Sequence, residues 1–212
     1  MTDQFEINIT GDRKMVTTVS LAVKLFDGFT QKQSVSGSQV YIKERETRMV
    51  KNLSGYYIFI DMPGGDYTVI VEADHFFPVE IPVSLPMPDP VKPVLEITLI
   101  PQPSYPFSPG TTLIRGMVQG KDKVPVEGAE VSVKSKKEVK GRTTAKGEFV
   151  LWFKGLTEDD ILREGNKTYV KGKPGKRIAL KAVKGSRSGE IQLEEVEEYA
   201  ATSPDKPITL KT

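Results

Sequence analysis

The side chain best suited to acid–base or metal chemistry in this chain is a lone histidine, His75, in the segment EADHFFPVE. A single histidine cannot build a multi-histidine metal site, and the His-Glu-x-x-His spacing of zinc enzymes does not occur. The chain has no cysteine, which excludes thiolate ligands, cysteine nucleophiles and disulfides. We therefore interpret His75 as a turn residue and expect no metal site and no cofactor.

Nucleophilic and glycosidic chemistry have equally little support. A Ser-His-Asp triad needs an activated serine, and the chain has no Gly-x-Ser-x-Gly motif. The pairs Glu194–Glu195 and Glu197–Glu198 have no aromatic platform beside them, so we interpret them as a solvated face instead of a glycosidase pair. The segment KGKPGKR, residues 171–177, lacks the Walker spacing and is either a solvated loop or a site for an anion or an acidic protein surface. We predict no catalytic residue and no enzyme.

Composition and charge are those of a soluble globular protein. The 212 residues are enough for one large domain or for two of about 100 residues. Residues 1–110 carry 9 basic against 13 acidic side chains, a net charge of −4, whereas residues 111–212 carry 21 against 15, a net charge of +6. This asymmetry fits two units with different surfaces. Acidic residues interleave with the basic ones in the second half, so we expect no nucleic-acid partner.

The first residues, MTDQFEINIT, lack the basic and apolar regions of a secretory signal. No apolar run approaches the roughly 18 residues of a membrane span. We therefore expect a cytoplasmic protein without a membrane span, with incorporation into a particle left open. The alternation of Phe5, Ile7 and Ile9 favours an extra strand that pairs with its own sheet or with the edge of a neighbour.

Proline divides the chain into two halves. Each proline fixes φ and removes a backbone donor, and nine of the 15 lie close together: Pro82, Pro86, Pro88, Pro90, Pro93, Pro101, Pro103, Pro106 and Pro109. One alternating run survives among them, VLEITLI at residues 94–100, and predicts the last strand of a first domain. The segment PQPSYPFSPG, residues 101–110, is then a stiff extended linker that Tyr105 and Phe107 hold against a domain.

Both halves contain the same series of short strands. Three segments of the first half recur in order in the second, at nearly constant offset: VSLAVKLFDG (19–28) as TLIRGMVQG (112–120), GSQVYI (37–42) as GAEVSV (128–133), and SGYYIFI (54–60) as KGEFVLWF (146–153). Matched segments in one order predict a tandem duplication. Period-2 alternation, as in Leu21, Val23 and Leu25, predicts about seven strands per copy and a β-sandwich.

The second half resembles the carboxypeptidase regulatory-like domain, a prealbumin-like β-sandwich. The family pattern is found at Gly116, Val118, Pro125, Val126, Gly128, Ala129, Val131, Val133, Thr144, Gly147 and Phe149. The first half is similar to a diverged copy, which lacks the proline and keeps the ending PGGDYTVIVEA. The resemblance implies two tandem Ig-like or prealbumin-like sandwiches of a usually non-catalytic kind, and it implies a fold, not an activity.

Residues 154–177 depart from this template. The first copy has the short turn DMPGGDY where the second has KGLTEDDILREGNKTYVKGKPGKR, and long insertions often carry function. Within the insertion, Thr157 as N-cap, Asp160 as its capping-box partner and Gly165 as stop give the best helix signal of the chain. The basic end of the insertion supplies four candidate interface residues: Lys171, Lys173, Lys176 and Arg177.

A second candidate interface lies on the outer faces of two matching strands. In GEFVLWFKG, Trp152 points outward if Phe149 and Leu151 face the core. The matching strand of the first half has its own apolar outer stripe: Tyr56, Ile58 and Ile60. Exposed apolar stripes indicate an interface, and the alternative is that the linker or the other domain covers them.

The sequence therefore predicts an all-β chain with an N-terminal arm or extra strand (1–18), a first sandwich (19–100), a linker (101–110) and a second sandwich (111–212). We expect a non-catalytic structural or adaptor protein that docks other proteins, as a homo-oligomer or as an accessory subunit of a larger, phage-tail-like contractile assembly. The alternative is a glycan- or surface-binding module that uses Trp152 and the 154–177 insertion.

Overall fold

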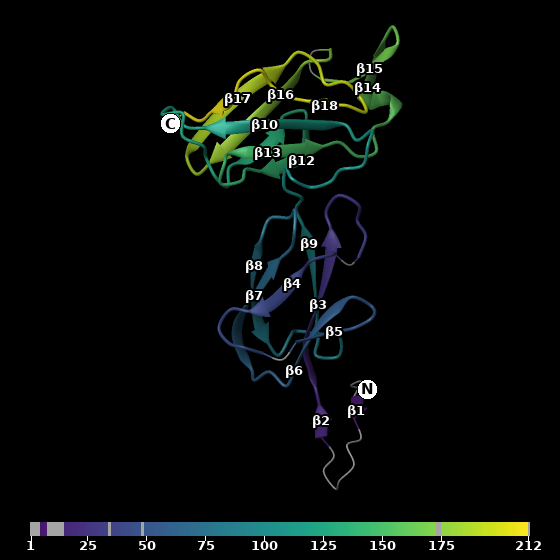
Figure 1. The fold of residues 1–212 in the computed structure, drawn as a ribbon, viewed down its shortest axis with the longest axis vertical. Helices are drawn as coiled ribbons and strands as arrows, with labels where there is room; N and C mark the ends of the chain where they lie inside the picture. Colours follow the sequence, from purple (N-terminus) through teal and green to yellow (C-terminus); the bar gives the residue numbers. More distant parts are fainter. Residues whose placement is uncertain (1–4, 8–14, 34, 48, 173–174, 212) are drawn as a thin grey trace. The chain divides into compact units, whose positions relative to one another are not determined.

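The computed structural model describes residues 5–7, 15–33, 35–47, 49–172 and 175–211, and its fold is all-β, as predicted (Figure 1). Within these ranges the one helical element is the 3-10 turn η1 (Glu158–Asp160). The chain divides into two compact units, Met1–Pro101 (unit 1) and Gln102–Thr212 (unit 2). The proline-rich segment 102–110 therefore belongs with unit 2. The prediction that it is extended is wrong, because the chain turns where the Tyr105 amide bonds to the Gln102 carbonyl and again where the Thr111 amide bonds to the Ser108 carbonyl.

Unit 1 consists of two sheets and an N-terminal hairpin. Its strands are β1 (Phe5–Ile7), β2 (Met15–Thr17), β3 (Val19–Asp27), β4 (Gln39–Ile42), β5 (Met49–Lys51), β6 (Tyr56–Ile60), β7 (Gly65–Glu72), β8 (Val79–Leu85) and β9 (Val94–Leu99). One sheet has the order β5-β6-β3-β9 and the other β4-β7-β8, while β1 pairs with β2. Strand β9 runs parallel to β3 over six residue pairs.

The alternation seen in the sequence decides which side chains of unit 1 are buried. Leu21, Val23 and Leu25 on β3 have no exposed surface; on β6, Phe59 has none and Tyr57 is 2% exposed. Because successive side chains of a strand point to opposite faces, their neighbours lie on the outer face of the same sheet. The period-2 prediction for these strands is confirmed.

Unit 2 repeats this arrangement with an added hairpin. Its strands are β10 (Leu113–Gln119), β11 (Glu130–Val133), β12 (Lys136–Arg142), β13 (Glu148–Trp152), β14 (Ile161–Glu164), β15 (Lys167–Val170), β16 (Ile178–Lys184), β17 (Arg187–Leu193), β18 (Ala201–Thr202) and β19 (Ile208–Thr209). Strand β10 pairs with β13 and, in parallel, with β18 and β19, as β3 pairs with β6 and β9. The order β12-β11-β16-β17 matches β4-β7-β8, with β12 added at the edge.

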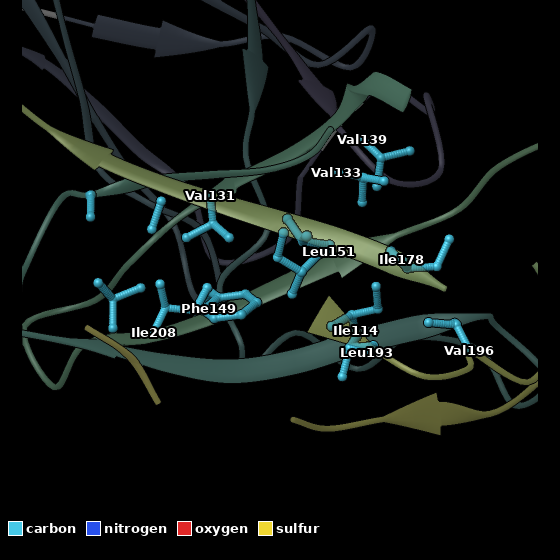
Figure 2. Close-up of a cluster of buried hydrophobic side chains, with 14 of the residues drawn as sticks. Ile114, Val131, Val133, Val139, Phe149, Leu151, Ile178, Leu193, Val196 and Ile208 are labelled. Carbon is cyan, nitrogen blue, oxygen red and sulfur yellow. The ribbon is translucent and has the colours of Figure 1, made fainter. Parts of the chain in front are cut away.

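The core of unit 2 lies between its two sheets (Figure 2). Val131 and Ile178 reach it from the β11–β16 sheet, while Ile114, Phe149 and Leu151 reach it from β10 and β13. Phe149 is 1% exposed and the other four side chains have no exposed surface. Complete burial of a Leu, Ile or Phe side chain stabilises a fold by about 1.5–3 kcal/mol, so this layer is the main source of stability of the unit.

The stretch VPVEGAEVSV, residues 124–133, forms part of the scaffold. Gly128 turns the chain with φ +64, and Ala129, Val131 and Val133 then enter the core with no exposed surface. The hydroxyl of Thr143, from the loop after β12, donates to the Val126 carbonyl (2.6 Å) and accepts from the Ala129 amide (2.8 Å). A buried side chain thus closes the turn.

The helix signal in the insertion is wrong. The capping box of Thr157 and Asp160 does form, but it caps only the single turn η1, and the chain then continues as the hairpin β14–β15. Gly165, expected to stop a helix, has φ +61 between the two strands. Ile161, Tyr169 and Val170 are paired within the hairpin. An isolated helix as short as this segment would be only marginally stable, so strand pairing gives the segment more stability.

Candidate functional site

The outer face of the β5-β6-β3-β9 sheet carries the apolar stripe that the sequence indicated in unit 1. Tyr56, Ile58 and Ile60 point away from the core and are half-buried. Ile58 pairs with Val50 on one side and with Ala22 on the other. Val50 is 44% exposed. An apolar row thus crosses three neighbouring strands on this face.

The cation Lys24 lies beside this apolar row. Lys24, on β3, pairs with Tyr56, and its Nζ is 5.8 Å from the centre of that ring and 4.6 Å from the centre of the Phe26 ring. Its ion-pair partner is Glu96 on β9, at 3.4 Å. The Lys24 side chain is only 19% exposed, so its hydrocarbon stem adds to the apolar surface while its charge is shared with a carboxylate and two rings.

The equivalent face of unit 2 is covered. Trp152, on the outer face of β13, is half-buried, and the ring of Phe107 lies 5.7 Å from it between centroids. Tyr105 packs edge-on against Phe107 at 4.8 Å. Of the two alternatives left open by the sequence, cover by the proline-rich segment therefore applies to Trp152.

Arg115 fastens the same segment to the sheet. Its guanidinium donates to the carbonyl of Pro103 and lies 5.6 Å from the centre of the Phe107 ring. Val150, which pairs with Arg115 on the outer face, is 2% exposed. The segment 102–110 thus works as a cover that uses one aromatic ring and one main-chain carbonyl.

The insertion folds onto the acidic segment that follows β17. The amide of Val170 donates to the Val196 carbonyl (2.8 Å), and the amide of Glu198 donates to the Thr168 carbonyl (2.8 Å). Residues 195–198 thereby lie along β15 as an irregular third strand beside the hairpin, with a bridge between Tyr169 and Glu197. Backbone bonds fix the insertion in place.

Charged side chains reinforce this contact. Lys167 pairs with Glu197 (3.0 Å), Arg177 with Glu194 (2.8 Å), and Lys176 with Glu195 (3.0 Å). Lys176 also pairs with Glu164 on β14 (2.9 Å) and lies 4.5 Å from the centre of the Tyr169 ring. The hydrogen bonds that the Lys176 ammonium donates to Glu164 and Glu195 raise its pKa above the usual range.

These pairs change the interpretation of the basic candidates. Lys176 and Arg177 are engaged by carboxylates of unit 2 itself, Lys171 is exposed, and Lys173 lies outside the described residues. The glutamates interpreted as a solvated face are the partners of the insertion. The basic segment 171–177 and the glutamates at 194–198 were each interpreted alone. Their opposite charges were the sequence signal that the two segments pair.

A further ion pair ties the start of the insertion to the β12 edge. Lys136 contacts the Asp160 carboxylate, which also accepts hydrogen bonds from the amide (3.0 Å) and hydroxyl (2.8 Å) of Thr157. The bond from Lys136, and then those from Thr157, hold the pKa of Asp160 well below its usual range. Both charged side chains are partly buried. The arrangement anchors the turn η1.

His75 lies in a turn with φ +67, in agreement with its interpretation as a turn residue. Over the described ranges, no group of three or more His, Asp or Glu side chains has the arrangement of a metal site. None of the helical structure in those ranges is long and apolar enough to cross a membrane. The strand predicted at Phe5, Ile7 and Ile9 is described only as the backbone of β1, and Ile9 lies outside the described residues.

Comparison with known proteins identifies no family. No family model matches the chain, and no curated protein matches it. Among solved structures, the Bacillus anthracis TIE protein is similar over 90% of this chain and 34% of its own, with 12% identity and a TM-score of 0.31. A streptococcal ancillary pilin is similar over 92% of this chain and 62% of its own, with 13% identity and a TM-score of 0.27. The chain spans less than two thirds of either structure.

Proposed function

We propose that the protein is a non-catalytic structural or adaptor protein that docks other proteins, and that the outer face of the β5-β6-β3-β9 sheet is its docking surface. The observation that carries this proposal is the apolar row Val50–Ile58–Ala22 with Tyr56 and Ile60 beside it. Contiguous apolar surface on a sheet is costly in water and is typical of an interface.

The contrast between the two units supports this surface as the site. In unit 2 the matching residue Val150 is 2% exposed, and the segment 102–110 contacts its neighbours Arg115 and Trp152, whereas Ile58 in unit 1 is only half-buried. Among the described side chains, the ring contacts, ion pairs and side-chain hydrogen bonds of Tyr56, Ile58 and Ile60 stay within their own sheet and its β5–β6 turn, where the Asn52 side chain accepts from the Tyr56 amide (2.9 Å). The surface of unit 1 is therefore suited to a partner.

Two further parts of the proposal concern the domain family of the two units and the place where the protein acts. We infer that both units are carboxypeptidase regulatory-like sandwiches, on the residues matched in the sequence, and that the chain acts in the cytoplasm as an accessory subunit of a larger assembly such as a contractile, phage-tail-like particle. A glycan-binding role has less support, because Phe107 packs against Trp152, the aromatic residue on which a sugar would stack.

Photo-crosslinking tests the docking surface. A photoreactive phenylalanine analogue at Val50 should yield a specific protein adduct in the native lysate, and the same analogue at Val91, which is 65% exposed outside the face, should not. Adding Ile58→Lys should abolish the adduct while the circular dichroism spectrum is unchanged. Equal adducts from both positions, or an adduct that survives Ile58→Lys, would refute the proposed surface.

A further inference from the structure

We infer that the partner of the unit 1 face is a non-helical segment that carries proline and aromatic residues, laid across the outer face as residues 102–107 lie on the outer face of unit 2. This inference rests on the proposed function and names the chemistry of the partner. Its basis is the internal duplication, which places the same sheet face in the molecule twice, once covered and once open.

The strand registers establish that the two faces are equivalent. Ala22 on β3 pairs with Ile58 on β6, and Arg115 on β10 pairs with Val150 on β13. Two positions further along, Ile60 on β6 matches Trp152 on β13. At these positions the two faces share strand directions and outward residues, whereas β5 has no counterpart beside β13 and a bulge between Val19 and Leu21 shifts the register at Ile60.

The covered face shows which features of an occupant matter. The aromatic ring of Phe107 packs on the outward residue Trp152, and the carbonyl of Pro103 accepts from the outward cation Arg115. Pro103 lies in a turn that the Tyr105 amide closes on the Gln102 carbonyl (3.0 Å), and the prolines at 103 and 106 fix φ, so little conformational entropy is lost when the segment lies on a sheet. The occupant of the covered face thus contributes an aromatic ring and a main-chain carbonyl.

The open face offers the corresponding groups. Ile58 and Ile60 form an apolar platform for a ring, and Tyr56 adds an aromatic edge. Ala22 holds the position of Arg115, and a cation is supplied instead by Lys24, two residues further along β3, whose ammonium also pairs with Glu96 (3.4 Å). A proline-rich aromatic segment meets both requirements, and its binding would bury Val50, which is 44% exposed.

A peptide titration tests the inference on the full chain. The probe is the acetylated, amidated peptide PQPSYPFSPG, the sequence of residues 101–110. We expect saturable ¹H–¹⁵N shifts at the amides of β5 and β6. Binding should weaken at least tenfold in Ile58→Lys and in the milder variant Val50→Lys, stay unchanged in Val91→Lys, and vanish for a peptide with serine at both aromatic positions.

Three outcomes would overturn the inference: no saturable shift at millimolar peptide, shifts confined to unit 2, or a dimer in light scattering that Ile58→Lys dissociates, which would make a second copy the occupant. The crosslinking experiment distinguishes a failure of the proposed docking surface from a failure of the proposed partner chemistry. A specific adduct at Val50 with no peptide binding would refute the segment chemistry and leave the docking surface in place.

Discussion

The buried hydroxyl of Thr143 gives the sharpest stability prediction. Thr143 is 1% exposed, and its Oγ1 both donates to the Val126 carbonyl and accepts from the Ala129 amide. Thr143→Val keeps the shape of the side chain and removes both bonds. The Ala129 amide then stays buried without its partner, since Ala129 has no exposed surface.

The expected loss is about 2 kcal/mol in the free energy of unfolding of unit 2. Each lost bond has a net value of about 0.5–1.5 kcal/mol, and an orphaned buried donor costs about 1–3 kcal/mol. The methyl group that replaces the hydroxyl returns about 0.8 kcal/mol through apolar burial. The amide penalty already contains part of the bond energy, so these contributions do not add in full.

The neighbouring residue is the matched control. The Oγ1 of Thr144 is buried and finds no hydrogen-bond partner among the described residues, so Thr144→Val should be neutral or stabilising, by up to about 1 kcal/mol. Urea unfolding followed by Trp152 fluorescence measures both variants, because the only tryptophan of the chain lies in unit 2. Equal destabilisation by the two substitutions would refute the reasoning.

Three further predictions concern charge and backbone. Asp160→Asn should destabilise unit 2 at pH 7 because Lys136 loses its carboxylate. Since the pKa of Asp160 is depressed in the folded protein, the loss in free energy of unfolding should be full above about pH 5 and shrink as the pH falls below about 4. A loss that does not depend on pH would contradict this. Both Gly147 (φ +74) and Gly155 (φ +57) have positive φ, but a Cβ at Gly147 would lie 2.5 Å from a backbone carbonyl oxygen, whereas Gly155 faces open space. In urea unfolding, Gly155→Ala should lower the free energy of unfolding by about 1–2 kcal/mol, and Gly147→Ala should lower it by more. Equal losses would count against the clash. Lys176→Gln should speed amide hydrogen exchange in residues 161–170 at low salt, and much less at 1 M salt, because salt screens the ion pairs of Lys176. An equal effect at 1 M salt would exclude these ion pairs as the cause.

The strands and the core were predictable because their signal is local. Alternation at Leu21, Val23 and Leu25, or at Ala129, Val131 and Val133, specifies both a strand and its buried face, since the side-chain period of a strand is two. The duplication then predicted one set of strands from the other. The outward position of Trp152 followed from the same alternation.

The insertion was not predictable, because its local and non-local signals conflict. The capping residues Thr157 and Asp160 indicate a helix, and the capping box does form. Residues 195–198, however, form backbone hydrogen bonds with β15, and their glutamates pair with lysines of the insertion. Tertiary contacts of this kind override propensities of a few tenths of a kcal/mol per residue.

The sequence by itself determined the strand periodicity, the duplication and the apolar stripe at Tyr56, Ile58 and Ile60, because each depends on residues close together in the chain. Only the tertiary structure decided which faces and charges are already occupied. Phe107 reaches Trp152 across 45 positions, and Glu195 reaches Lys176 across 19. Whether a side chain is covered depends on such long-range partners, and these arise only once the sheets have packed.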